Sequence, residues 1–306
     1  MPYRVSFAED PPAALRRCAR EEIEHAIEQL ERRHDADPVE AVHEARKSIK
    51  KTRAVLRLAR PDLDKRSYRD ENRSLRDAGR AVSAVRDADV MLETVDGLNQ
   101  RFVGQVPTKA FASVRRGLAS QAQVARELDE AVVAQLVDDL NGALRRVDDW
   151  PLDGVGWKTI RRATIRSYRR ARKAGGGALR HPTAQTLHEW RKRVKDLWYH
   201  QRLLEEAWPA VMGAQAQELH ALSDALGEDH DLAVLADHLS RDPESPAGES
   251  VGADEILELA ARRRAELLEA AAHQDRRLFA ESPKAYGRRL KRYLKAAVSE
   301  EASATA

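Results

Sequence analysis

The chain contains the same nine-residue pattern twice, 145 residues apart, and this repeat limits its possible folds more than any other feature. The first copy is Val42–Lys50 and the second is Leu187–Lys195. Both read apolar-His-Glu-x-Arg-Lys-x-apolar-Lys. A repeat at a fixed offset indicates that one supersecondary unit is used twice. We therefore expect two similar halves, at about residues 1–150 and 151–306.

Both copies become amphipathic when they are placed on an α-helix, which turns by about 100° per residue. Val42, Ile49 and Leu56 share one apolar face, and Leu187, Val194 and Leu197 do so in the second copy. The adjoining face carries His43, Arg46, Lys47, Lys50 and Arg57 in the first copy, and His188, Arg191, Lys192, Lys195 and Arg202 in the second. A basic face beside the core is partly sheltered, which strengthens its attraction for an anion. We expect an anion-binding role rather than an ordinary solvated surface, with Glu44 and Glu189 pointing elsewhere.

The composition and the spacing of breaker residues indicate an all-α fold. Ala, Leu, Arg and Glu dominate, aromatic residues make up 5%, and no stretch alternates as a strand does. Helices are expected near 11–34, 38–60, 65–99, 107–148, 156–174, 181–208, 209–240, 253–280 and from 283 onward. We expect a kink in 65–99 and a break in 107–148 near Gly117 or Asn141-Gly142. Gly175-Gly176-Gly177 is expected to end the fifth helix and to form a flexible link.

The charge of the chain is segregated, although 53 Lys and Arg nearly balance 50 Asp and Glu. Residues 154–188 hold nine basic residues and no acid, and 42–60 hold seven against Glu44 alone. Residues 218–258 instead hold twelve acids and only Arg241. Any single block is compatible with a solvated helix face. Several such blocks together favour a basic surface that concentrates anions.

Other features narrow the class of protein. No apolar run approaches the roughly 18–20 residues that a membrane-spanning helix needs. The start of the chain lacks the apolar segment of a signal peptide. Cys18 is the only cysteine, which excludes an internal disulfide and a cysteine-based zinc site. We expect a soluble cytoplasmic protein without a cofactor.

A second, weaker pair of segments follows the basic faces. Val85–Val90 and Gly227–Leu232 share Asp-x-Asp-apolar at an offset of 142 residues. The favoured interpretation is that these carboxylates cap a helix or form ion pairs. They are also suited to orient a neighbouring arginine side chain. Further basic residues recur at helical spacing, namely Arg69, Arg73, Arg76 and Arg80 in the first half, and Arg162, Arg166, Arg169, Arg170 and Lys173 in the second.

The duplicated His-Glu-x-Arg-Lys-x-x-Lys segments and the two Asp-x-Asp segments resemble the CHAD (conserved histidine α-helical domain) family, and the resemblance covers nearly the whole chain. It implies one domain over 1–306, built from two similar bundles of long antiparallel helices related by pseudo-two-fold symmetry. It also implies a basic central groove that binds inorganic polyphosphate, and association with polyphosphate granules and their proteins. Glu228 departs from the symmetry, because the first half has Arg86 at that position.

Some members of this family are fused to a triphosphate-tunnel domain with an ExExK strand motif. Glu22-Ile23-Glu24-His25 lacks the lysine and lies in a helical pattern. We therefore expect no enzymatic activity.

The basic faces suit a linear polyanion that has no bases. Arginine offers forked donors and lysine a mobile point charge. Tyr199 is the one aromatic residue among them, whereas binders of single-stranded nucleic acid interleave aromatic residues to stack bases. We expect polyphosphate rather than nucleic acid, although binding to a duplex backbone needs no aromatic residue. A metal-dependent phosphohydrolase is the remaining alternative, with its carboxylates at Asp87, Asp89, Asp229 and Asp231.

The two duplicated histidines leave several roles open. The favoured one for His43 and His188 is a contact to a phosphate oxygen or to the Asp-x-Asp carboxylates. A role as metal ligands has thin support, since neither helix has a second histidine four residues on. A role as phosphoacceptor or general acid–base is the third alternative. If they contact phosphate, binding should strengthen as the imidazoles protonate.

Overall fold

The fold is known from a computed structural model, which describes residues 3–33, 37–81, 83–105, 108–125, 130–241 and 252–304. Every regular element in these ranges is helical, as the sequence predicts. The first half contains α1 (Pro11–Glu31), α2 (Pro38–Ala59), α3 (Lys65–Ala81), α4 (Ser83–Arg101), α5 (Thr108–Ala125) and α6 (Glu130–Val147). The second contains α7 (Trp157–Arg180), α8 (Ala184–Leu203), a 3-10 turn η1 (Glu205–Ala207), α9 (Pro209–Arg241), α10 (Ala253–Leu278) and α11 (Pro283–Ala304).

Two expected helix interruptions were wrong. The expected break near Gly117 or Asn141-Gly142 is absent, because these residues lie inside α5 and α6. The triple glycine does not end a helix, because α7 continues through it to Arg180. The expected kink in 65–99 stays a prediction, since residue 82 between α3 and α4 lies outside the described residues, as do 126–129 between α5 and α6.

Gly175 permits a close approach of other helices and does not end α7. A Cβ atom at this position would overlap Oδ1 of Asp275 on α10 and would lie 3.0 Å from the indole of Trp190 on α8. Glycine costs about 1 kcal/mol relative to alanine inside a helix. Packing of the fully buried Trp190 against the bare backbone offsets that cost.

The same pairs of helices contact one another in the two halves. α1 contacts α2 and α6, as α7 contacts α8 and α11. α4 contacts α5, as α9 contacts α10. α9 therefore takes the place of both α3 and α4, because α2 contacts α3 as α8 contacts α9. A two-fold axis between the halves, a single domain over 1–306 and a central groove stay predictions.

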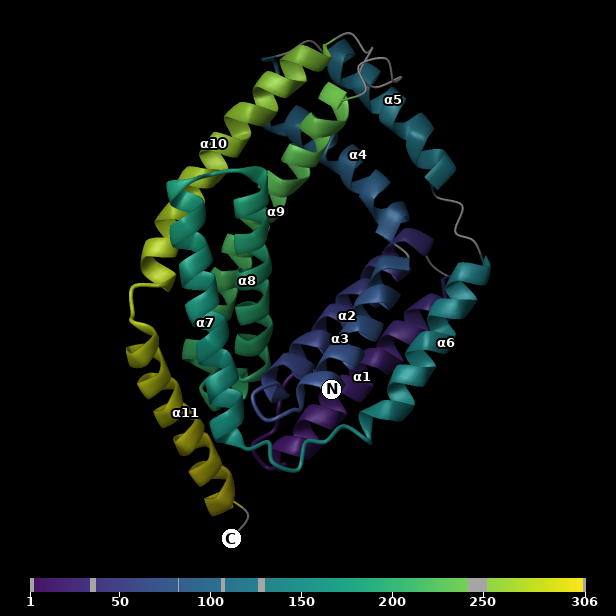
Figure 1. Ribbon diagram of the computed structural model, residues 1–306. Helices are drawn as coiled ribbons and strands as arrows, with labels where there is room; N and C mark the ends of the chain where they lie inside the picture. Colours follow the sequence, from purple (N-terminus) through teal and green to yellow (C-terminus); the bar gives the residue numbers. More distant parts are fainter. Residues whose placement is uncertain are drawn as a thin grey trace.

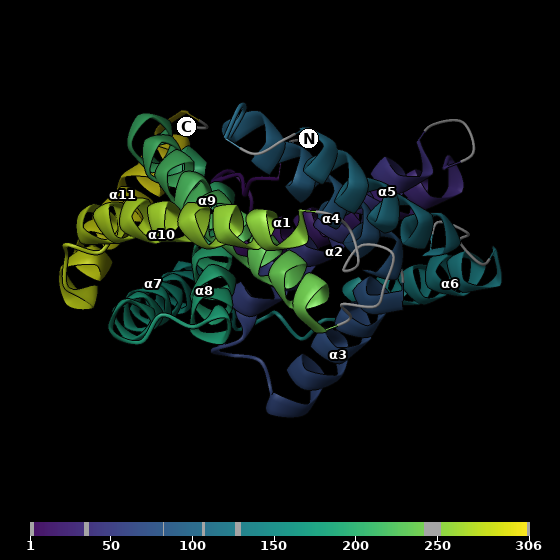
Figure 2. The ribbon, with the colours of Figure 1, turned by 90° about the horizontal axis from the view of Figure 1, so that it is seen from above.

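Two hydrophobic cores connect the halves at opposite ends of the molecule. The larger joins α1, α2, α3 and α6 to α7, α8 and α11, and includes Leu15, Leu56 and Trp190. The smaller joins α4 and α5 to α10 and the carboxyl-terminal part of α9. The helices consequently form a closed ring in Figure 1, and Figure 2 shows α9 and α10 reaching across to α4 and α5.

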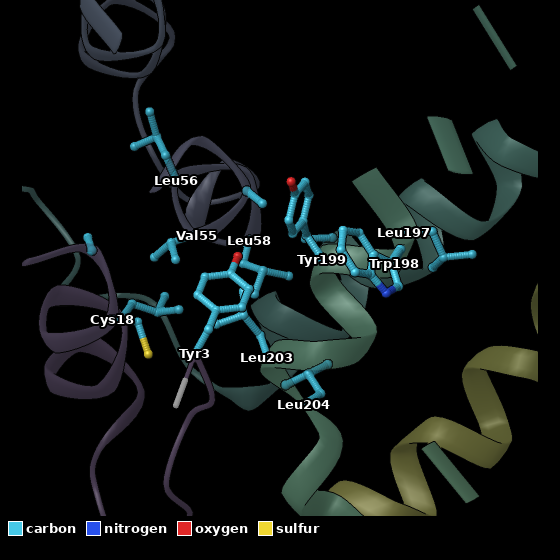
Figure 3. Packing of buried hydrophobic residues seen from close by; sticks show 14 of the residues in the cluster. Tyr3, Cys18, Val55, Leu56, Leu58, Leu197, Trp198, Tyr199, Leu203 and Leu204 are labelled. Atoms are coloured by element: carbon cyan, nitrogen blue, oxygen red, sulfur yellow. The ribbon is translucent and has the colours of Figure 1, made fainter. Parts of the chain in front are cut away.

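The segment before α1 fastens the first half to the second. The amide of Val5 donates to the carbonyl of Leu203 at 2.9 Å, and the Tyr3 hydroxyl donates to the carbonyl of Lys51 at 3.0 Å. Figure 3 shows Tyr3 beside Leu58 of α2 and Leu203 of α8. Burial of a leucine side chain contributes roughly 1.5–3 kcal/mol, so this junction stabilises the relative placement of α2 and α8.

Among the described helices, none combines the length and the apolar character needed to cross a membrane.

Candidate anion-binding site

The two helices that carry the repeat cross each other at equivalent positions. Ala54 on α2 and Tyr199 on α8 are related by the offset of 145 residues. Next to them, the buried His200 ring contacts the Ala54 carbonyl through Nε2 at 3.2 Å, and burial lowers the pKa of His200 to about 4. The imidazole is therefore neutral, and Nε2–H donates. Arg57 and Asp196 form an ion pair at 2.8 Å beside this contact. From the crossing, α2 and α8 diverge toward their amino-terminal ends, and these two diverging parts are called the arms (Figure 1).

Basic side chains of the two arms act on each other across the space between α2 and α8. Burial first, then the charges of Lys195, Arg46 and Arg191, lowers the pKa of the Lys50 ammonium group to about 7. Lys50 keeps an exposed surface. Protein packed on its other sides nevertheless reduces the water around its charge. Burial and the neighbouring Arg191 lower the pKa of Lys195 to about 8. The two repeats thus place equivalent lysines in one cluster, where the charged neighbours of Lys50 are cations and those of Lys195 also include Asp224 and Asp231.

Lys50 and Lys195, together with the cations that act on them, form the central cluster, which consists of Arg46, Lys47, Lys50, Arg53, Arg191 and Lys195. Arg53 is absent from the sequence-based set. Its Nε donates to Asn72 on α3 at 3.2 Å, and burial followed by the Arg57 charge lowers its pKa to about 10. The sequence held a signal for this residue, because Arg53 follows Arg46 by seven positions and so lies on the same helix face.

The sequence predicts that the glutamates of the repeat point away from the basic faces, but in the structure both pair with lysines of those faces. Glu44 pairs with Lys47 at 2.8 Å, and Glu189 pairs with Lys192 at 2.7 Å. These pairs are equivalent at the offset of 145, and each spans three residues of a helix. The expectation was wrong because side-chain rotamers let neighbouring glutamates reach the basic face. Lys47 and Lys192 are therefore partly neutralised, whereas Lys50 has cations as its strongest charged neighbours.

A second basic group surrounds Asp196 next to the crossing. This carboxylate is buried and pairs with Arg57 of α2 and, at 3.3 Å, with Arg193 of α8. Arg170 of α7 belongs to the same group, since burial and then the Arg193 charge lower its pKa. Arg57 thus serves an ion pair that holds the helices together.

Two predicted residues of α8 lie among aromatic rings. The guanidinium of Arg202 lies 5.3 Å from the centre of the Trp198 ring and 5.8 Å from that of Tyr3. Tyr199 is 4% exposed and meets Tyr3 edge to face, so its ring belongs to the core. The hydroxyl nevertheless lies near Arg202 and Arg57, whose charges oppose the rise that burial causes in its pKa.

The other predicted basic residues occupy the outer parts of α3 and α7. Arg73 and Arg80 are exposed on α3, and Arg169 and Lys173 are exposed on α7. Arg162 lies 3.7 Å from Asp62, and Arg166 is partly exposed. The side chain of Arg86 lies outside the described residues. The structure therefore brings some predicted residues into the central cluster and leaves these on adjoining surfaces.

The duplicated histidines differ in their surroundings. His43 is partly exposed on α2. The His188 ring lies 4.0 Å, centre to centre, from the ring of His230, the middle residue of the second Asp-x-Asp segment. Burial lowers the pKa of His188, and it lowers that of His230 to about 4. Both rings are consequently neutral near pH 7, and in the described part of the chain nothing bonds to the buried Nδ1 of His188.

The second Asp-x-Asp segment makes structural contacts. Asp229 is 3% exposed and accepts from Nε of Arg264 on α10 at 2.9 Å, while burial raises its pKa. The side chain of Asp87, in the first segment, lies outside the described residues. Across the described residues, no group of three His, Cys, Asp or Glu side chains is arranged to hold a metal ion.

The fold and this site define an all-helical protein in which a repeated helix supplies a cationic cluster at a crossing. The model of the CHAD domain matches residues 17–240. The chain belongs to this family, as the duplicated motif had indicated, and membership supports a role related to polyphosphate.

Solved structures share the fold at low sequence identity. PptA from Streptomyces chartreusis is similar with a TM-score of 0.64 and 16% identity, over 89% of this chain and 100% of that one. The crystal structure of the CHAD domain from the plant Ricinus communis gives 0.57 and 15%, over 92% and 94%. No curated protein matches the chain. At these identities the likeness to solved structures establishes the fold alone.

Proposed function

We propose that the chain binds inorganic polyphosphate without cleaving it, and that the central cluster is the primary site. The observation that carries this proposal is the gathering of Lys50 and Arg46 of α2 with Arg191 and Lys195 of α8, cations that with burial lower the pKa of Lys50 to about 7. Such a cluster is destabilised in the absence of an anion, because like charges share a partly dehydrated space. A chain of phosphates supplies closely spaced negative charges that relieve this repulsion on both arms at once.

The surroundings of the cluster favour phosphate chains over nucleic acid. Among the aromatic residues near the cluster, Tyr3, Trp198 and Tyr199 are at most 7% exposed, so they offer no face on which a base could stack. Tyr68, near Arg53, is partly exposed and packs against the core. Sequence-independent binders of single strands rely on such faces for roughly 1–3 kcal/mol per base. A duplex backbone remains a competitor, and its rejection is part of the test below.

The main test removes the two equivalent lysines. Lys50→Gln combined with Lys195→Gln should weaken binding of long-chain polyphosphate by at least about tenfold, because two sheltered charge contacts are lost. Titration with chains of defined length at two salt concentrations measures this. The matched control, Lys291→Gln with Lys295→Gln, removes two exposed lysines of α11 and should change affinity much less.

Three outcomes would contradict the proposal. The first is unchanged affinity in the Lys50 and Lys195 variant. The second is displacement of polyphosphate by excess duplex DNA. The third is release of phosphate in the presence of Mg²⁺ or Mn²⁺, which would reveal an enzyme.

We further propose that this binding directs the protein to polyphosphate granules in the cytoplasm, where a fluorescent fusion of the Lys50 and Lys195 variant should lose its granular distribution.

A further inference from the structure

Helices α3 and α9 differ in charge at equivalent positions near the central cluster, although Asp231 of α9 has a counterpart in Asp89 of α4. In the first half, α3 carries Arg73, Arg76 and Arg80. At the offset of 142 residues that relates the Asp-x-Asp segments, α9 carries Gln215, Glu218 and Leu222 instead. The next turns of α9 add Asp224, Glu228 and Asp231, of which Glu228 is paired with Arg263 of α10 at 2.6 Å.

Arg191 of the central cluster rests directly on this acidic part of α9. Its guanidinium lies against the backbone at Gly227, where a Cβ would be only 2.8 Å from Nη2. Asp224 and Asp231 precede and follow Gly227 by three and four residues, so they flank Arg191 on one face of α9. Arg191, Asp224 and Asp231 line one pocket of about 690 Å³ between α4 and α9.

A second set of contacts brings Asp224 near Lys195. The Lys195 ammonium lies 5.7 Å from the centre of the Trp198 ring. The His220 ring meets the same indole edge to face at 4.6 Å and pairs with Asp224. Asp224 and Asp231 also oppose the fall in the pKa of Lys195, so their charge reaches the cluster. An incoming polyanion meets these carboxylates as repulsive neighbours.

On the other side of the central cluster, α3 carries basic side chains that can contact a polyanion. Arg53 joins the cluster to α3 through its bond to Asn72 and lies near Arg76. Arg76 is followed by Arg80 and preceded by Arg73 at helical spacing, and both of these are exposed. The acids of α3 are themselves paired: Asp77 with Arg76 at 2.8 Å, Asp70 with Arg66 at 3.8 Å and Glu71 with Arg146 at 2.5 Å. Basic side chains thus continue from the cluster along α3.

We propose that a bound polyphosphate chain leaves the central cluster in one direction, along α2 and α3, because Asp224 and Asp231 repel it from α9. This inference rests on the proposed function, since it assigns a path to the ligand of the same site. It makes the two acids determinants of affinity and the α3 arginines an extension that only a long chain reaches. Two pairs of variants test it.

In the first pair, Asp224→Asn combined with Asp231→Asn should raise the affinity for polyphosphate by about threefold or more, since two repulsive charges near the cations are removed. The control, Asp138→Asn with Glu300→Gln, makes the same change in net charge at exposed positions on α6 and α11. It should have a much smaller effect. Thermal unfolding of each variant verifies that the fold is retained.

In the second pair, Arg73→Gln with Arg80→Gln should weaken binding of chains with on the order of 100 phosphates, and should leave binding of chains with about ten unchanged. The control, Lys109→Gln with Arg116→Gln, removes two exposed cations of α5. If the wild type binds no polyphosphate, the proposed function itself fails. If it binds but either expected change is absent relative to its control, the one-directional path is overturned while the proposed function stands.

Discussion

Lys50 has a positive charge that opposes folding and favours binding. Its ordinary pKa is 10.5, and the folded chain lowers it to about 7 through burial and the cations around it. The folded state therefore holds this proton less tightly than the unfolded state does. The destabilisation is complete below about pH 7, declines as the pH rises, and vanishes above the unfolded value. A residue that costs stability in this way points to a binding role.

The substitution Lys50→Gln should accordingly stabilise the free protein. We expect a gain of up to about 1 kcal/mol at pH 6, because solvent screens much of the repulsion at an exposed side chain. The gain should shrink toward zero near pH 10.5. Thermal unfolding at several pH values measures it, with Lys291→Gln as the control. A gain that is equal at both ends of this range would contradict the assigned pKa.

Helix α7 illustrates where local signals and tertiary packing disagree. Three consecutive glycines ordinarily end a helix, since each loses much backbone entropy when it becomes helical. Here the helix continues for three residues beyond Gly177. Asp275 and Trp190 approach the backbone at Gly175, whereas a Cβ at Gly177 would meet nothing within 4 Å. The three glycines therefore have different roles.

Alanine substitutions should separate these roles. Gly175→Ala should destabilise the protein by about 2 kcal/mol or more, because the new methyl group displaces the indole of Trp190 or the Asp275 carboxylate. Gly177→Ala should stabilise it by roughly 0.5–1 kcal/mol, the difference in helix propensity. Urea unfolding of the two variants measures both values. A stabilising Gly175→Ala would show that the helices have room to separate there.

The sequence predicts the helical faces well and their side-chain contacts poorly. Val42, Ile49 and Leu56 repeat every seven residues, and periodic burial of this kind is set by helix geometry alone. The burial of Tyr199 depends on Tyr3, which arrives from a segment distant in sequence. The ion pair between Glu44 and Lys47 depends on rotamers that the spacing does not specify. Patterns within one helix are visible in the sequence, whereas contacts between helices need the fold.

At the scale of the whole molecule, ligand binding is coupled to proton binding, because the ring brings lysines of both halves into one cluster. The free protein holds Lys50 and Lys195 near pKa values of about 7 and 8. A polyanion between the arms raises both values, because it favours the charged form of each ammonium group. Binding therefore takes up protons wherever the free lysines are partly neutral. The affinity should fall as the pH rises from about 6.5 to 9, and the change should come from both halves.

Calorimetry in buffers of different ionisation enthalpy measures this proton uptake, which we expect between about pH 7 and 9. The matched variant, Lys50→Arg with Lys195→Arg, retains both charges but keeps them protonated throughout this range, since arginine titrates above about pH 12. It should bind with little proton uptake and a flat pH profile. His188 and His230 are present in both proteins, so any change in their protonation cancels in the comparison. Titration of the ends of the polyphosphate chain is common to both proteins and cancels in the comparison. An arginine variant with the same proton uptake as the wild type would place the titrating groups outside the central cluster.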